Sequence, residues 1–162
     1  MKIAFIQTGG TIDKDYPRAK GGYAFEIGEP AVKRILQKAN LNFDFEIISI
    51  LKKDSLDITE DDRKKIRDAC EKAATDKIVV THGTDTMIET AEKLSSIKGK
   101  VIVLTGAMKP EKFVDSDASF NLGTAVGAVN VLQQGVYLAM NGRIYLWNKV
   151  KRNSHTGQFV EK

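Results

Sequence analysis

The chain has 162 residues, of which 42% are hydrophobic and 28% are charged, the size and composition of a single soluble globular domain. The apolar runs are far shorter than the ~20 residues that cross a bilayer, and the amino terminus lacks a signal-peptide core, so we expect a cytoplasmic protein without a membrane partner. The 25 basic and 21 acidic residues are mixed along the chain, which argues against a nucleic-acid partner. With a single cysteine, Cys70, and two distant histidines, we expect no disulfide, no metal site and no cofactor.

Strand-like and helix-like segments alternate along the chain. In order, the sequence predicts a strand over 2–7, a helix around 32–39, a strand over 43–50, a helix around 59–73, a strand over 77–81, a helix from about 86, a strand over 101–105, a helix over 118–133 and a strand over 135–140. This alternation predicts a largely parallel sheet with helices on both faces. Ligands of such sheets bind beyond the carboxyl ends of the strands, so the candidate loops begin near Thr8, Leu51, Thr81 and Thr105.

Capping patterns mark the starts of two of these helices. Thr59 followed by Asp62 is similar to a capping box, and Thr86 followed by Glu89 fits the same pattern. The helix from Thr86 is expected to bury Met87, Thr90, Ala91 and Leu94. The helix over 118–133 is apolar nearly all round, which predicts that it is sandwiched between other elements.

The first candidate loop reads Thr8-Gly9-Gly10-Thr11-Ile12-Asp13. Paired glycines allow a sharp turn and bring backbone N–H groups close to a ligand. The loop is neither a dinucleotide fingerprint nor a P-loop, so it offers chiefly the Thr11 hydroxyl, which needs a base to become a nucleophile. The alternative is a tight turn in which Thr11 is only a cap.

The third candidate loop reads Thr81-His82-Gly83-Thr84-Asp85-Thr86 and precedes a predicted helix. The free N–H groups of a helix start suit a carboxylate or an oxyanion. Thr84 adds a second hydroxyl, and Asp85 adds an acceptor for a substrate ammonium. The alternative is that these residues only cap the helix, and His82 is expected to support the loop rather than to titrate.

Three motifs occur together in this order: Gly-Gly-Thr-Ile, the segment 81–91 that reads THGTDTMIETA, and Thr-Gly-Ala-Met-Lys-Pro at 105–110. This combination resembles the bacterial-type L-asparaginase family. The resemblance extends from Lys2 to about Arg152 and covers only the family's N-terminal domain, as in its short single-domain members. It implies a flavodoxin/Rossmann-like three-layer α/β sandwich with a mainly parallel sheet, formed by residues 1–162 as one domain without a C-terminal domain.

The resemblance implies that Thr11 attacks the side-chain amide of the substrate and forms an acyl-enzyme. A tyrosine of the following segment assists the nucleophile in that family. Tyr16 matches the short relatives, and Tyr23 matches the longer ones by distance. Gly21 and Gly22 would supply a hinge between them.

The other substrate contacts implied by the resemblance come from two further loops. Thr84 becomes the second catalytic threonine, and Asp85 binds the substrate α-ammonium. Ser55 meets the α-carboxylate, helped by the backbone amides of Gly10 or Thr84. Leu56 stands where the longer enzymes often have glutamine, so one polar contact is lost.

The family also has a lysine near the second threonine. Strict alignment places Arg152 at that position, and arginine stays protonated and cannot relay a proton. Either Lys151 takes the role after a shift of one residue, or this second triad is weakened. The alternative for the segment is a solvated basic tail.

The leading hypothesis is therefore an amidohydrolase that converts L-asparagine to L-aspartate and ammonia, without a cofactor, as a homodimer or homotetramer with weak or absent glutaminase activity. A second hypothesis is an inactive amino-acid-binding or regulatory module on the same scaffold, favoured by Arg152 and Leu56. A third is an asparaginase-like subunit that acts with a Glu-tRNA partner, although such subunits usually carry additional domains.

Overall fold

A computed structural model describes residues 1–16 and 25–162 of the chain. Its main sheet has six strands in the order β4-β1-β5-β6-β7-β8. Their bounds are β1 Lys2–Gly9, β4 Asp44–Lys53, β5 Lys77–Thr81, β6 Val101–Thr105, β7 Gly135–Met140 and β8 Arg143–Leu146. The first five strands in this order pair in parallel and β8 is antiparallel to β7, which confirms the predicted α/β class.

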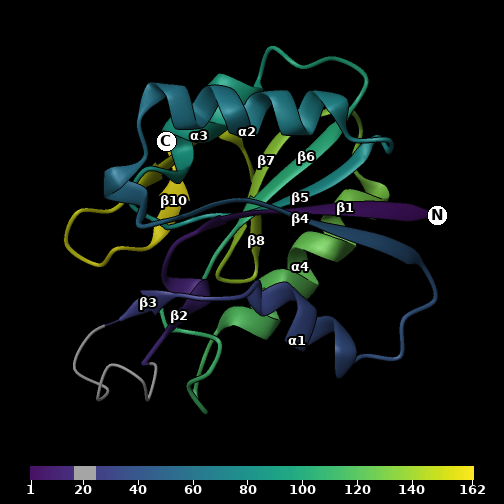
Figure 1. Cartoon of the computed structure of the whole chain (residues 1–162). Helices are drawn as coiled ribbons and strands as arrows, with labels where there is room; N and C mark the ends of the chain where they lie inside the picture. Colours follow the sequence, from purple (N-terminus) through teal and green to yellow (C-terminus); the bar gives the residue numbers. More distant parts are fainter. Residues whose placement is uncertain (17–24) are drawn as a thin grey trace.

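In the described part of the chain, four helices cover the two faces of the sheet (Figure 1). Their bounds are α1 Ala31–Gln37, α2 Glu60–Lys72, α3 Met87–Leu94 and α4 Ala118–Val131. One core cluster joins α2 and α3 to one face of the sheet, and a second joins α1 and α4 to the other. Side chains alternate between the clusters, as Ile78 and Val80 of β5 face the first and Val79 faces the second. Among the described residues, none of the helices is both long and apolar enough to cross a membrane.

The capping prediction is confirmed at α2 and wrong at α3. At α2 the Thr59 hydroxyl accepts from the Asp62 N–H at 3.2 Å, and the Asp62 carboxylate accepts from the Thr59 N–H at 3.0 Å. At α3 the Thr86 side chain makes no cap bond and instead donates to the carbonyl of Ser55 at 2.7 Å. The predicted buried face of α3 is confirmed for all four residues: Met87, Thr90, Ala91 and Leu94.

The prediction of a sandwiched fourth helix is also wrong. Helix α4 buries one face against the sheet, but Phe120 is 63% and Val131 is 79% exposed on the other. The helix ends two residues before the predicted limit of 133. Its apolar composition therefore reflects small residues against the sheet together with an uncovered outer face.

The structure adds short strands that the sequence patterns did not predict. Strand β8 follows β7 through Asn141 and Gly142, which have φ values of 54° and 77°. An Asn-Gly pair with both residues in the left-handed region is the usual signal for a two-residue hairpin. Two small ribbons also occur within residues 1–16 and 25–162: β2 Lys14–Asp15 with β3 Glu26–Ile27, and β9 Val150–Arg152 with β10 Phe159–Glu161.

Strand β1 lies between β4 and β5, and the chain order along the sheet reverses there. In doubly wound sheets such a reversal opens a crevice beyond the carboxyl ends of the strands. The loops after β1, β4 and β5 therefore meet where the fold favours a ligand.

Candidate functional site

Glycines allow the loops at the carboxyl ends of the strands to touch. A Cβ on Gly10 would lie 2.3 Å from the Gly83 nitrogen, and one on Gly83 would lie 2.6 Å from Ser55 Oγ. A Cβ on Gly106 would lie 2.3 Å from the carbonyl oxygen of His82. Only residues without side chains permit backbone approach this close. The loops after β1, β4 and β6 are therefore each in contact with the loop after β5.

Thr11 begins a 3-10 turn, Thr11–Asp13, directly after the close approach of Gly10. Gly10 has φ 85° and ψ −176°, a conformation that favours glycine. The Gly10 N–H donates to the carbonyl of Lys53 at 2.9 Å, so this amide is already used within the fold. Thr11 is half-buried, and its hydroxyl has no hydrogen-bond partner within the described part of the chain.

Ser55 presents a buried hydroxyl to the same place. The residue is 1% exposed, and its Oγ has no hydrogen-bond partner among the described residues. Asp54 starts the turn Ser55–Asp57 by accepting from the Leu56 N–H at 3.2 Å, and Lys14 pairs with Asp54 at 2.7 Å and lowers its pKa. Leu56 is 73% exposed. An unpartnered buried hydroxyl is what a site made for a polar ligand leaves open.

Thr84 and Asp85 follow Gly83 in the loop after β5. Thr84 is buried and Asp85 is exposed. Asp85 forms an ion pair with Arg152 of β9, and Arg152 Nε also donates to the carbonyl of Gly157 at 3.1 Å. Lys151 is exposed and, as the neighbouring residue of the strand, has its side chain on the opposite side. The structure thus brings Arg152, and not Lys151, to the acidic residue of the loop.

His82 supports this loop from inside, as expected. It is fully buried, with Nδ1 2.7 Å from the Gly83 carbonyl and Nε2 2.8 Å from Thr90 Oγ1. A carbonyl only accepts, so Nδ1 carries the proton and Nε2 accepts from the threonine. Burial lowers the pKa of His82 to about 4, so the ring is neutral at pH 7.

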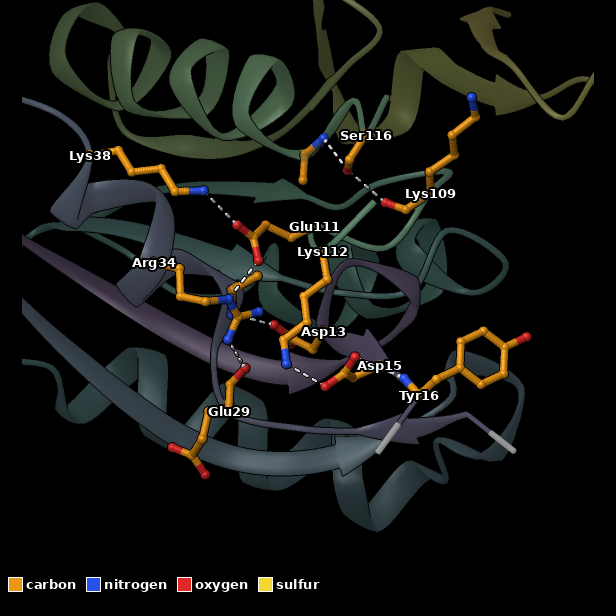
Figure 2. Close-up of polar contacts among 12 residues, drawn as sticks. Asp13, Asp15, Tyr16, Glu29, Arg34, Lys38, Lys109, Glu111, Lys112 and Ser116 are labelled. Carbon is orange, nitrogen blue, oxygen red and sulfur yellow. Dashed lines mark hydrogen bonds and ion pairs between the residues drawn. The ribbon is translucent and has the colours of Figure 1, made fainter. Parts of the chain in front are cut away.

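Of the two candidate tyrosines, only Tyr16 is described, while Tyr23 and the glycines at 21 and 22 lie outside the described residues. Tyr16 is 44% exposed, and its ring packs on Phe25 with the centroids 4.1 Å apart. In Figure 2 its ring points away from the cluster of charged side chains around Arg34. Tyr16 forms no hydrogen bond to Thr11 within the described part of the chain.

The structure adds two buried acidic residues that the sequence patterns did not indicate, Asp13 within the turn of Thr11 and Glu111 next to it. Asp13 is 1% and Glu111 is 9% exposed, and both contact α1 or its start. Burial raises the pKa of Asp13 to about 6, while the hydrogen bond from the Ala31 N–H, the nearby Gln7 side chain and the charges of Arg34 and Lys52 oppose that rise. Neither residue lies in a pattern that indicates burial, because both are charged and stand in loops.

The described residues thus form a doubly wound α/β sheet, and the candidate site lies where its threonine- and glycine-rich loops converge. This chain matches the family model described as "Asparaginase, N-terminal" over residues 2–159. The chain belongs to the asparaginase family and corresponds to its N-terminal domain.

Individual relatives agree with this assignment. The chain is 35% identical over 161 residues to the L-asparaginase of Thermococcus kodakarensis, covering 94% of this chain and 48% of that one. It is 34% identical over 171 residues to a glutamyl-tRNA(Gln) amidotransferase subunit of Methanococcus vannielii, covering 99% of this chain and 38% of that one. The solved thermostable L-asparaginase of Thermococcus kodakarensis superposes with a TM-score of 0.87 at 29% identity, covering 99% of this chain and 51% of that chain.

The chain thus spans about half the length, or less, of the curated relatives it matches.

Proposed function

We propose that the chain is an amidohydrolase that converts L-asparagine to L-aspartate and ammonia, with Thr11 as the nucleophile. The observation that carries this proposal is the convergence of the loops: Gly10 against Gly83, and Gly83 against Ser55. These contacts bring the hydroxyls of Thr11, Ser55 and Thr84 to one end of the sheet. Family membership supports the same reaction.

The proposed reaction has two steps. The Thr11 oxygen forms a bond to the amide carbon, the C–N bond breaks, and the hydroxyl proton leaves with the nitrogen as ammonia. A water oxygen then bonds to the same carbon, the ester bond to Thr11 breaks, and the threonine oxygen regains a proton. Backbone N–H groups of the neighbouring loops would stabilise the oxyanion of both steps. Thr84 would serve as the second threonine, and a tyrosine, Tyr16 or Tyr23, would assist Thr11.

Two charged ends of the substrate need partners. Ser55 is proposed for the α-carboxylate, because its hydroxyl is buried and unpartnered among the described residues and lies against Gly83. Asp85 is proposed for the α-ammonium, in exchange for part of its contact with Arg152. Gly10 contributes by allowing close approach, since its own N–H is bound to Lys53.

The test is ammonia release from L-asparagine and L-glutamine by the wild type and by Thr11→Val. We expect release from L-asparagine in the wild type and a loss of at least about 1,000-fold in the variant, because the attacking oxygen is removed. Thr124→Val is the matched control, because Thr124 is also half-buried but lies on α4, where its hydroxyl donates to Phe120 at 2.9 Å. Full release by Thr11→Val would refute the assignment of the nucleophile.

The ion pair between Asp85 and Arg152 favours a second candidate, a binding module that keeps the pocket without the chemistry. Its signature would be a rise in melting temperature with L-asparagine but no ammonia from any variant. The similarity to the amidotransferase subunit of Methanococcus vannielii suggests a third, in which release appears only with a partner protein.

A further inference from the structure

The short turn Thr11–Asp13 is held from outside by three separate elements. At its start, the Gly10 N–H donates to Lys53 at the end of β4 at 2.9 Å. In its middle, the carbonyl of Ile12 accepts from the Glu111 N–H at 3.1 Å. At its end, the Asp13 carboxylate accepts from the Ala31 N–H at the start of α1 at 2.7 Å. A three-residue turn has few hydrogen bonds of its own, so these external bonds define where Thr11 lies.

The Asp13 carboxylate that accepts from the start of α1 is buried. Asp13 is 1% exposed, its Oδ2 has no hydrogen-bond partner among the described residues, and its own carbonyl accepts from the Gly28 N–H at 2.9 Å. It therefore joins the turn to both α1 and the strand β3 that precedes Gly28. Burying a carboxylate with one oxygen unpartnered is costly, and proteins keep such groups where geometry matters.

Glu111 holds the same turn from the other side. Its side chain is 4% exposed and accepts from Arg34 Nε of α1 at 2.6 Å and from Nζ of Lys38, just after that helix, at 3.3 Å. Figure 2 shows Glu111 between these two side chains, with Asp13 on the other side of Arg34. The pairing fixes Glu111 against α1, so that its backbone N–H meets the carbonyl of Ile12.

Helix α1 is thus the common support of two buried carboxylates on either side of Thr11. We propose that Asp13 and Glu111 are positioning residues for Thr11, which hold the turn at both sides through α1 without touching the substrate. This inference rests on the proposed role of Thr11 as nucleophile. A displacement of about 1 Å of a reacting group can cost roughly 100-fold in rate, so the effect should fall on turnover.

The kinetic test uses Asp13→Ala, Asp13→Asn and Glu111→Ala with ammonia release from L-asparagine. Asp13→Ala is expected to lower kcat about 10- to 100-fold with KM changed less than about threefold, because attack and not substrate binding is impaired. Asparagine keeps an oxygen that can accept from Ala31, so Asp13→Asn should recover most of that loss. Glu111→Ala should lower kcat about 10-fold.

The matched control is Glu161→Ala, which removes an exposed ion pair with Arg143 at 2.8 Å between β8 and β10. It should leave kcat and KM unchanged. Circular dichroism checks that each variant is folded, and Asp13→Asn keeps the proposal testable if Asp13→Ala does not fold. A parallel rise of KM and fall of kcat in all variants, with no recovery by Asp13→Asn, would overturn the proposal.

Hydrogen exchange of backbone amides separates this inference from the proposed function. Asp13→Ala should speed exchange of the Ala31 and residue-13 amides at least about tenfold, and Glu111→Ala should do the same for the residue-111 amide, with Val79 of β5 unchanged. If the wild type releases no ammonia, the proposed function fails, and the exchange result alone decides whether these residues hold the turn. Unchanged exchange at these amides would overturn it.

Discussion

The hydroxyl-bearing residues Thr11 and Ser55 differ in how deeply they are buried. Thr11 is half-buried, whereas Ser55 is 1% exposed with an unpartnered Oγ. Leaving a buried polar group without a partner costs roughly 1–3 kcal/mol, which a bound ligand can recover. Among the described residues, nothing forms a hydrogen bond with the Ser55 hydroxyl, so a bound polar ligand would supply its missing partner.

Arg152 changes the chemistry that the loop after β5 can perform. Its guanidinium forms an ion pair with Asp85 and donates to the carbonyl of Gly157, and an arginine side chain does not release a proton in proteins. It can hold the acidic side chain in place, but it cannot move a proton to or from Thr84. This residue is consequently expected to limit turnover rather than to abolish binding.

Replacing Arg152 by lysine should test that limit. We expect Arg152→Lys to raise kcat for L-asparagine several-fold and to add a dependence on pH above about 8, because an ammonium can release its proton. Lys151→Ala is the control and should change kcat less than about twofold, since Lys151 is exposed on the other side of β9. A fall in kcat in each of the two single variants, Arg152→Lys and Lys151→Ala, would contradict the prediction that Arg152 limits turnover.

Asp13 and His82 should influence stability in opposite directions between pH 4 and 6.5. Burial raises the pKa of Asp13 from 3.8 to about 6, so the folded state takes up its proton first and acidification from 6 to 4 stabilises the fold. Burial lowers the pKa of His82 from 6.5 to about 4, so the same acidification destabilises it. The charges of Arg34 and Lys52 partly offset the rise in the pKa of Asp13, and the charge of Arg63 contributes to the fall in the pKa of His82.

The variant Asp13→Asn removes the stabilisation that Asp13 gives on acidification and leaves the effect of His82 in place. Between pH 6.5 and 4 it should lose about 2 kcal/mol more unfolding free energy than the wild type, because most of a shift of about two pKa units acts within this range. Urea unfolding at the two pH values measures this. Asp115→Asn is the control, because Asp115 is an exposed carboxyl whose pKa the hydrogen bond from Lys109 lowers, the opposite direction to Asp13. Equal losses in wild type and Asp13→Asn would contradict the prediction.

At the scale of single elements, helix starts show which local signals decide. The capping box of α2 forms because Thr59 and Asp62 need only each other. The same pattern before α3 does not form, because the Thr86 hydroxyl is bound to Ser55 in another loop. A local motif is therefore predictable when no distant group competes for its donor.

At the scale of the whole molecule, the site exists because four loops approach at glycines. Replacing Gly83 by alanine would place a Cβ 2.7 Å from Ser55 Cβ and force the loops apart. We expect Gly83→Ala to lower ammonia release at least about tenfold and the unfolding free energy by about 1–3 kcal/mol.

Gly123→Ala on α4 is the matched comparison. Its Cβ would meet nothing within 4 Å, and alanine favours a helix over glycine by about 1 kcal/mol. It should keep full release and gain a few tenths to about 1 kcal/mol, as measured by urea unfolding. Full activity in Gly83→Ala would show that the contact between the loops is not required.

Local sequence was enough to predict the parallel strands, the helices between them and the loops that carry Thr11, Ser55, Thr84 and Asp85. These features follow from periodicity, capping and short motifs, which act over a few residues. The matching strand bounds at β5, β6 and β7 are examples. Strand β8 was also within reach, because Asn141-Gly142 is a local turn signal.

Which groups meet across the chain depended instead on the folded arrangement. Arg152 reaches Asp85 over 67 residues, and Glu111 reaches Arg34 over 77 residues. Burial of Asp13 and Glu111 likewise depends on α1 packing over the turn of Thr11. Such contacts depend on how the sheet is wound and on the space left between elements, and a charged residue in a loop carries no periodic signal of being buried.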